Sequence, residues 1–162
     1  MMLKLWTSSE ALAAVTALAL VAVVGLTGCS DEPKDSHPDQ LVTKRREVFK
    51  QFGKTLEPMG LVARDRQPYN PREFNVNAEE LNKLASQPWG YFTPDSNYPP
   101  TRAKPEVWSK AADFKAAQDQ YRLSTQQLLK ASQSGDLDAI RPAVDNVQKS
   151  CKSCHDSFRN AR

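Results

Sequence analysis

Five consecutive residues near the C-terminus combine two thiols and an imidazole at a spacing that suits a prosthetic group. They are Cys151, Lys152, Ser153, Cys154 and His155. This C-x-x-C-H pattern is typical of c-type haem attachment. The thiols add to the two vinyl groups of a haem, and the imidazole ligates its iron. The sequence therefore predicts one covalently attached haem c, with Cys151 and Cys154 as attachment points and His155 as the axial ligand.

A redox-active or zinc-binding C-x-x-C followed by a chance histidine is the alternative interpretation. A structural zinc site needs four ligands. The other candidates are Cys29 and His37, and both precede the region that we expect to fold. Positions 151, 154 and 155 are also separated by three and four residues, which places them on one helix face, as haem attachment requires. Haem attachment is the better interpretation.

Residues 1–28 have the layout of an export signal. Lys4 precedes an apolar run over 11–26, and small residues then lead to Cys29. The Leu-Thr-Gly-Cys run that ends at Cys29 resembles the lipobox of bacterial lipoproteins. An uncleaved membrane anchor and ordinary cleavage nearby stay open, although the apolar run is short for a membrane span. We expect a lipoprotein signal peptide over 1–28, lipid on Cys29 and a periplasmic, membrane-anchored protein.

The segment after Cys29 has the composition of a tether. Residues 30–40 contain two prolines and no large apolar side chain. Such a segment cannot bury enough apolar surface to offset the entropy lost on ordering. We therefore expect a flexible tether over 29–40, and we do not expect His37 to be a ligand. The remaining residues, 41–162, are expected to form one domain.

The overall charge argues against a nucleic-acid partner. The chain has 162 residues, 40% of them hydrophobic, and a net charge of only +3. A nucleic-acid surface would require lysines and arginines clustered on one face.

With Cys151 and Cys154 assigned to haem and Cys29 to lipid, no cysteine is left for a structural disulfide.

The first helical pattern starts at Leu41. Its apolar stripe follows steps of three and four residues as far as Ala63. Arg45 occupies a stripe position where an apolar residue is expected, and burying its charge without a partner would be costly. Pro58 should kink the helix or break it near Leu56.

Three more helices are expected downstream. After a connection over 65–77, the second occupies about 78–86; the third starts at Pro105 and the fourth near Asp136. The apolar stripe of the fourth consists of Leu137, Ile140, Val144, Val147, Cys151, Cys154 and Phe158. Because both cysteines continue this stripe, the haem is expected inside the bundle. The sequence therefore predicts an all-α, antiparallel up-down-up-down four-helix bundle.

From about Leu41 to Arg159 the chain resembles the cytochrome c′ family of class II c-type cytochromes. The matching features are Cys-Lys-Ser-Cys-His-Asp at 151–156 with Arg159 just after it, Pro-Glu-Val-Trp at 105–108 leading to Phe114, Gly-Asp-Leu at 135–137, Gln-Pro-Trp at 87–89 and the early Arg45. The resemblance implies that Arg45 holds a haem propionate and that Arg159 lies beside the proximal histidine. The alternative for Arg159 is that its positive charge only interacts favourably with the dipole at the C-terminal end of the last helix.

The resemblance also bears on the sixth coordination position of the iron. In the six-coordinate cytochromes c-556 of this family, a methionine one turn after the early arginine ligates the iron. Phe49 stands at that place, and phenylalanine has no ligating atom. Met59 lies ten residues further on, about 15 Å along a helix, and is expected in the core. A pentacoordinate, high-spin haem with Phe49 over its distal face is therefore implied.

The expected function is an exported haem protein that binds small gases, nitric oxide foremost and carbon monoxide also, and is capable of one-electron transfer. It is not expected to be an enzyme. Peroxidase chemistry usually needs a polar acid or base on the distal side of the haem, and the apolar stripe places no histidine or acidic residue on the Phe49 face. A six-coordinate electron carrier of c-556 type is the alternative. The sequence does not specify the redox partner protein, and it leaves a homodimer open.

Overall fold

Four long helices form the bundle in the structure, a computed structural model that describes residues 33–161. The leader and Cys29 lie outside these residues, so the expectations for them stay predictions. The long helices are α1 (Leu41–Ala63), α2 (Pro71–Leu84), α4 (Ala111–Ser134) and α5 (Leu137–Phe158), and the short ones are η1 (Trp89–Tyr91), η2 (Pro94–Ser96) and α3 (Glu106–Ser109).

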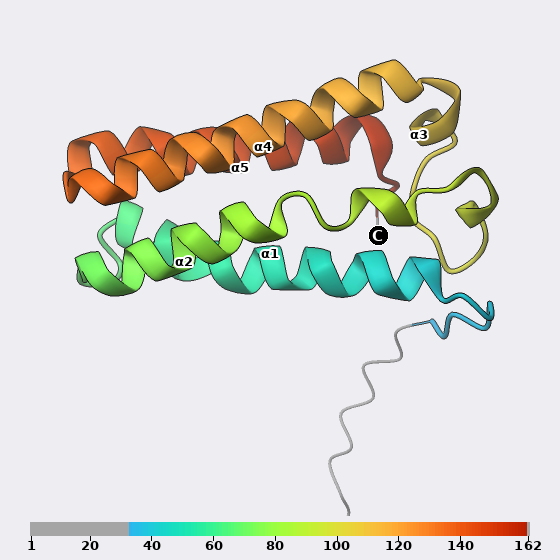
Figure 1. The fold of residues 1–162 in the computed structure, drawn as a ribbon, viewed down its shortest axis with the longest axis horizontal. Helices are drawn as coiled ribbons and strands as arrows, with labels where there is room; N and C mark the ends of the chain where they lie inside the picture. The colour runs from blue at the N-terminus through green and yellow to red at the C-terminus, as the bar shows by residue number, and fades with distance from the viewer. Residues whose placement is uncertain (1–32, 162) are drawn as a thin grey trace, which may run out of the picture. The chain divides into compact units, whose positions relative to one another are not determined.

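The predicted antiparallel four-helix bundle is confirmed. α1 and α4 run in one direction and α2 and α5 in the other (Figure 1). The end of α5 lies at the same end of the bundle as η1, α3 and the start of α1 (Figure 1). Within residues 33–161 there is no strand, only an isolated bridge between Ala103 and Arg159. None of the helices between residues 33 and 161 is long and apolar enough to cross a membrane.

Two groups of buried side chains stabilise the bundle. The main core extends along all four long helices and includes Phe52, Met59, Leu81, Tyr121, Leu128, Ile140, Val144 and Val147. A smaller end cluster consists of Val107, Phe114 and Phe158. Trp89 packs against both groups. Each large apolar side chain that is fully buried contributes about 1.5–3 kcal/mol to the free energy of unfolding. The buried apolar stripes therefore stabilise the long helices by more than local irregularities destabilise them.

Of the two outcomes predicted for Pro58, a kink or a break near Leu56, the break does not occur. α1 continues as one helix of 23 residues through Pro58 to Ala63. A proline in a helix interior costs about 3 kcal/mol, because one backbone hydrogen bond is lost. Met59 and Val62, directly after Pro58, are both buried in the main core. Their burial offsets this penalty and keeps the last turn helical.

The second helix starts seven residues earlier than predicted. Asn70 precedes it, and its side-chain oxygen accepts a hydrogen bond from the backbone nitrogen of Glu73 at 3.3 Å. Pro71 occupies the first turn, where no amide hydrogen is needed. Asn followed by Pro is a sequence signal for a helix start, but the prolines at 68 and 71 led to the expectation of a connection there.

The third helix is interrupted where a continuous one was expected. Lys110, with φ −119° and ψ 51°, separates α3 from α4. The indole nitrogen of Trp108 donates to the backbone oxygen of Thr93 at 2.8 Å. This bond holds α3 against the preceding loop, so the chain turns at Lys110 before α4 joins the bundle.

The last helix begins where the sequence predicts. Gly135 ends α4 with φ 69°, a conformation that glycine adopts without steric cost. The Asp136 side chain then caps α5 by accepting a hydrogen bond from the backbone nitrogen of Asp138 at 2.9 Å.

Part of the segment predicted as a tether contacts the bundle. A carboxylate oxygen of Asp35 accepts a hydrogen bond from the backbone nitrogen of Thr43 at 3.0 Å. The His37 ring stacks on Tyr98 with a centroid distance of 4.4 Å, and the Tyr98 hydroxyl accepts a hydrogen bond from the Leu41 nitrogen. These contacts fix the entry of the chain into α1.

Candidate haem site

The last two turns of α5 carry both thiols and the imidazole. Cys151 packs against the main core and Cys154 against the end cluster. The end of α5 is fastened to the loop before α3, because the Phe158 oxygen accepts a hydrogen bond from the Lys104 nitrogen at 2.9 Å. α5 thus places the two thiols at the junction of the two apolar groups, one helical turn apart.

Both thiols are protonated at neutral pH in this environment. Burial, and secondarily the neighbouring Cys154, raises the pKa of Cys151 to about 11. Burial also raises the pKa of Cys154. Thiolates rather than thiols are the reactive form, so neither residue is activated by its surroundings for spontaneous reaction.

The imidazole of His155 is suited to iron ligation. His155 is an exposed residue, but partial desolvation, together with the positive charges of Arg159 and Arg102, lowers its pKa, and Asp156 acts in the opposite direction. The neutral imidazole, which is the ligating form, is therefore favoured at neutral pH. Sequence reasoning missed Arg102, because the loop that carries it meets the end of α5 only in the folded chain.

A group of aromatic rings from α1, η1, α4 and the connection after η1 lies in this part of the bundle. Phe49 lies within 5.4 Å of Phe52, 5.9 Å of Trp89 and 6.3 Å of Phe92 between ring centroids. Trp89 in turn contacts Tyr121 at 6.4 Å. Cys151 packs against the main core, which includes Phe52 and Tyr121. An attachment point next to an apolar, water-excluding wall matches what a covalently bound haem needs.

Within residues 33–161, none of the aromatic rings that Phe49 contacts offers a ligand for the iron. Tyr121 lies one ring further, and burial strongly raises the pKa of its hydroxyl, so it stays protonated and is a poor ligand. Met59 is 1% exposed and belongs to the main core.

Arg45 is buried and has partners within the protein. Its side chain is 3% exposed, and its guanidinium lies 4.4 Å from the centroid of the Phe92 ring. The acceptors of its hydrogen bonds are the Tyr91 oxygen at 2.9 Å, the Ser96 hydroxyl at 3.0 Å, the Ser96 oxygen at 3.2 Å and the Thr101 hydroxyl at 2.5 Å. Arg45 therefore joins α1 to the loops around η1 and η2. Its contact with a haem propionate stays a prediction.

Arg159 lies directly after α5. Its backbone nitrogen donates to the His155 oxygen at 3.0 Å, and its charge contributes to the lowered pKa of that histidine. The predicted role of Arg159 beside the haem stays a prediction.

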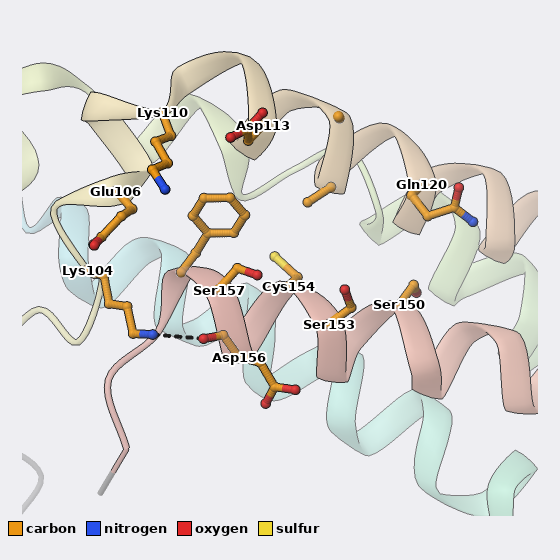
Figure 2. Close-up of a pocket in the computed structure, with 13 residues that line it drawn as sticks. Lys104, Glu106, Lys110, Asp113, Gln120, Ser150, Ser153, Cys154, Asp156 and Ser157 are labelled. Carbon is orange, nitrogen blue, oxygen red and sulfur yellow. Dashed lines mark hydrogen bonds between the residues drawn. The ribbon is translucent and has the colours of Figure 1, made fainter.

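A groove of about 740 Å³ runs along the outer side of Cys154, between α5 and the start of α4. The Cys154 sulfur points toward α4 beside this groove (Figure 2). Its polar lining consists of Lys104, Glu106, Lys110, Asp113, Gln120, Ser150, Ser153, Asp156 and Ser157. The Lys104 ammonium donates to the Asp156 backbone oxygen at 2.7 Å (Figure 2). Sequence reasoning missed the groove, because periodicity assigns such polar flanks to solvent.

Comparison with known proteins gives consistent matches over this domain. The family profile described as Cytochrome C′ matches residues 40–159. Cytochrome c′ from Alcaligenes xylosoxydans xylosoxydans is 33% identical over 125 residues, which are 77% of this chain and 97% of that protein. Cytochrome c′ from Rubrivivax gelatinosus is 30% identical over 123 residues, 75% and 95% of the two chains.

Solved structures agree with the sequence matches. The nitric oxide complex of a leucine-to-alanine mutant of cytochrome c′ from Alcaligenes xylosoxidans has a TM-score of 0.74 at 32% identity, covering 80% of this chain and 100% of that one. A cytochrome c-556 from Rhodopseudomonas palustris is more distant, 24% identical over 128 residues, 74% of this chain and 83% of that protein. The chain therefore belongs to the cytochrome c′ family and carries one covalently attached haem c.

Proposed function

We propose that this protein holds a five-coordinate haem and binds nitric oxide, and carbon monoxide more slowly, on the side of Phe49. The observation that carries the proposal is the wall around Phe49, which consists of the rings of Phe52, Trp89 and Phe92. These residues exclude water and supply no competing ligand. The haem supplies reversible gas binding and one-electron chemistry when it is bound.

In this proposal, residues of α5 bind the haem, and Phe49 of α1 restricts access to its iron. Cys151 and Cys154 hold the haem, and the neutral imidazole of His155 ligates its iron. Phe49 hinders entry on the opposite side, so a small, strongly binding gas is favoured over water. Solved structures of two cytochrome c′ variants from Alcaligenes xylosoxidans, a leucine-to-alanine mutant with nitric oxide and a leucine-to-glycine mutant with carbon monoxide, support gas binding.

A six-coordinate electron carrier is the second candidate, because two cytochromes c-556 are among the relatives, at 24% and 23% identity. Met59 would have to be the sixth ligand. It lies ten residues beyond Phe49 on the unbroken α1, about 15 Å along the axis. Electron transfer is compatible with both candidates, since the groove beside Cys154 leaves one flank of the attachment site open to a partner protein.

We infer export to the periplasm, from the C-x-x-C-H run and the layout of residues 1–28, and membrane anchoring through lipid on Cys29. Mass spectrometry of the mature protein tests this inference. A lipidated N-terminal Cys29 is expected, and a mature N-terminus at any other residue would contradict it.

The absorption spectrum of the purified haem protein tests the main proposal. Ferric and ferrous samples are measured alone, with carbon monoxide and with nitric oxide. A high-spin ferrous spectrum that changes with both gases is expected. A low-spin spectrum that neither gas alters would refute the proposal, and its loss in Met59→Leu would then identify Met59 as the sixth ligand.

A further inference from the structure

The hydroxyl of Tyr121 is a buried polar group without a partner. Tyr121 is 4% exposed, and its hydroxyl oxygen has no hydrogen-bond partner among the residues that the structure describes. A buried tyrosine hydroxyl usually has such a partner, and leaving it without one is destabilising. The polar end of this side chain therefore requires an explanation that the packing of the protein alone does not give.

The position of Tyr121 relates this hydroxyl to the haem site. The Ser124 and Ser150 hydroxyl oxygens lie 3.1 Å apart and fix the register of α4 against α5. Tyr121 is one turn before Ser124 on α4, and Cys151 directly follows Ser150 on α5. Cys151 packs against the main core, to which Tyr121 belongs.

Tyr121 also belongs to the same group of aromatic rings as Phe49. The Tyr121 ring lies 5.1 Å from Phe52 and 6.4 Å from Trp89. Phe49 contacts these same two rings, at 5.4 and 5.9 Å. The two side chains thus share one aromatic wall, and Tyr121 carries the only hydroxyl among these four rings.

We propose that the Tyr121 hydroxyl donates a hydrogen bond to a diatomic gas held in the haem pocket and thereby prolongs its binding. This inference rests on the proposed function, because it needs a gas on the side of Phe49. Aromatic rings exclude water from the pocket, so the bound gas is the acceptor that the hydroxyl otherwise lacks. Tyr121 is then a specificity-determining residue, since a polar diatomic ligand gains more from the donor than an apolar one.

The test compares Tyr121→Phe with the wild-type haem protein and with Tyr69→Phe. The Tyr69 hydroxyl is likewise buried without a partner. Tyr69 lies in the α1–α2 connection, at the end of the bundle opposite the end of α5 (Figure 1), and its ring contacts Phe74. Each variant removes one oxygen atom and keeps the ring, so only the position of the lost hydroxyl differs.

Two measurements on the ferrous carbon monoxide complex give the readout. A hydrogen bond to the gas lowers the C–O stretching frequency, so this band should move to higher frequency in Tyr121→Phe and stay in place in Tyr69→Phe. Gas dissociation should become roughly fivefold faster in Tyr121→Phe, which corresponds to about 1 kcal/mol, the size of one hydrogen bond. In the wild type, the band should also shift between H₂O and D₂O buffer.

Some results would overturn only the role of Tyr121, and a different result would overturn gas binding itself. An unchanged band and dissociation rate in Tyr121→Phe would overturn the inference alone. A change confined to the reduction potential would also overturn it, because the hydroxyl would then act on the Cys151 sulfur. If neither gas alters the wild-type spectrum, the proposed function fails first, and the inference fails with it.

Discussion

Phe49 controls access to the iron in the proposed mechanism. Its ring closes the wall formed by Phe52, Trp89 and Phe92, so a gas must displace it. We expect Phe49→Ala to speed carbon monoxide association at least about tenfold, because tenfold corresponds to only about 1.4 kcal/mol of barrier. Flash photolysis measures this rate. Phe74→Leu, in the main core, is the control, and an equal rate in Phe49→Ala and the wild type would rule out a gating role.

Arg45 is a structural residue whether or not it also holds a propionate. Its hydrogen bonds join α1 to Tyr91, Ser96 and Thr101. Arg45→Met leaves these acceptors without their donor and should lower the free energy of unfolding by about 3 kcal/mol. Urea denaturation of the haem protein measures the loss, with the exposed Arg72→Met as control. Equal stability of Arg45→Met and Arg72→Met would contradict this role. If Arg45→Met lowers the free energy of unfolding more in the haem protein than in the haem-free protein, that would support the propionate contact.

At the scale of elements, the start of α2 depends on one cap. The Asn70 side chain accepts the hydrogen bond from the Glu73 nitrogen that otherwise has no partner in the first turn. Asn70→Ala should therefore destabilise the protein by about 1 kcal/mol. The exposed Asn146→Ala, in the interior of α5, should have no such effect, since no cap is lost there. Chemical denaturation compares the two, and a stability of Asn70→Ala equal to that of the wild type would show that Pro71 alone starts the helix.

At the scale of the whole molecule, acid should loosen the entry of the chain into the bundle. Burial alone would raise the pKa of Asp35, but hydrogen bonds from Thr43 and His37 outweigh it and lower the pKa below the ordinary value of 3.8. A depressed carboxyl pKa contributes stability that is complete above the unfolded pKa and is lost as the pH falls through the folded pKa.

Asp35→Asn tests this pH dependence. The variant should be less stable than the wild type at pH 7, and the difference should shrink below about pH 4, where the wild-type carboxylate becomes protonated. Thermal unfolding at pH 7, 5 and 3 measures it, with Asp39→Asn as an exposed control. A difference that stays constant with pH would mean that the carboxylate charge does not stabilise the fold.

The sequence by itself determined the haem attachment, the all-helical fold and the register of α5. These features are local, since the C-x-x-C-H run and the heptad spacing of α5 lie within one helix. Helix ends were less predictable. The start of α2 and the break at Lys110 depend on how the neighbouring loops pack.

Only the tertiary structure decided the partners of Arg45, the groove beside Cys154 and the unpartnered hydroxyl of Tyr121. The acceptors of Arg45 lie 46 to 56 residues away in the sequence. The rings of Phe49 and Tyr121 come from different helices and meet through Trp89, which lies between those helices in the chain. A sequence pattern specifies which face of a helix is apolar. Which distant residues share that face depends on the packing of all four helices at once.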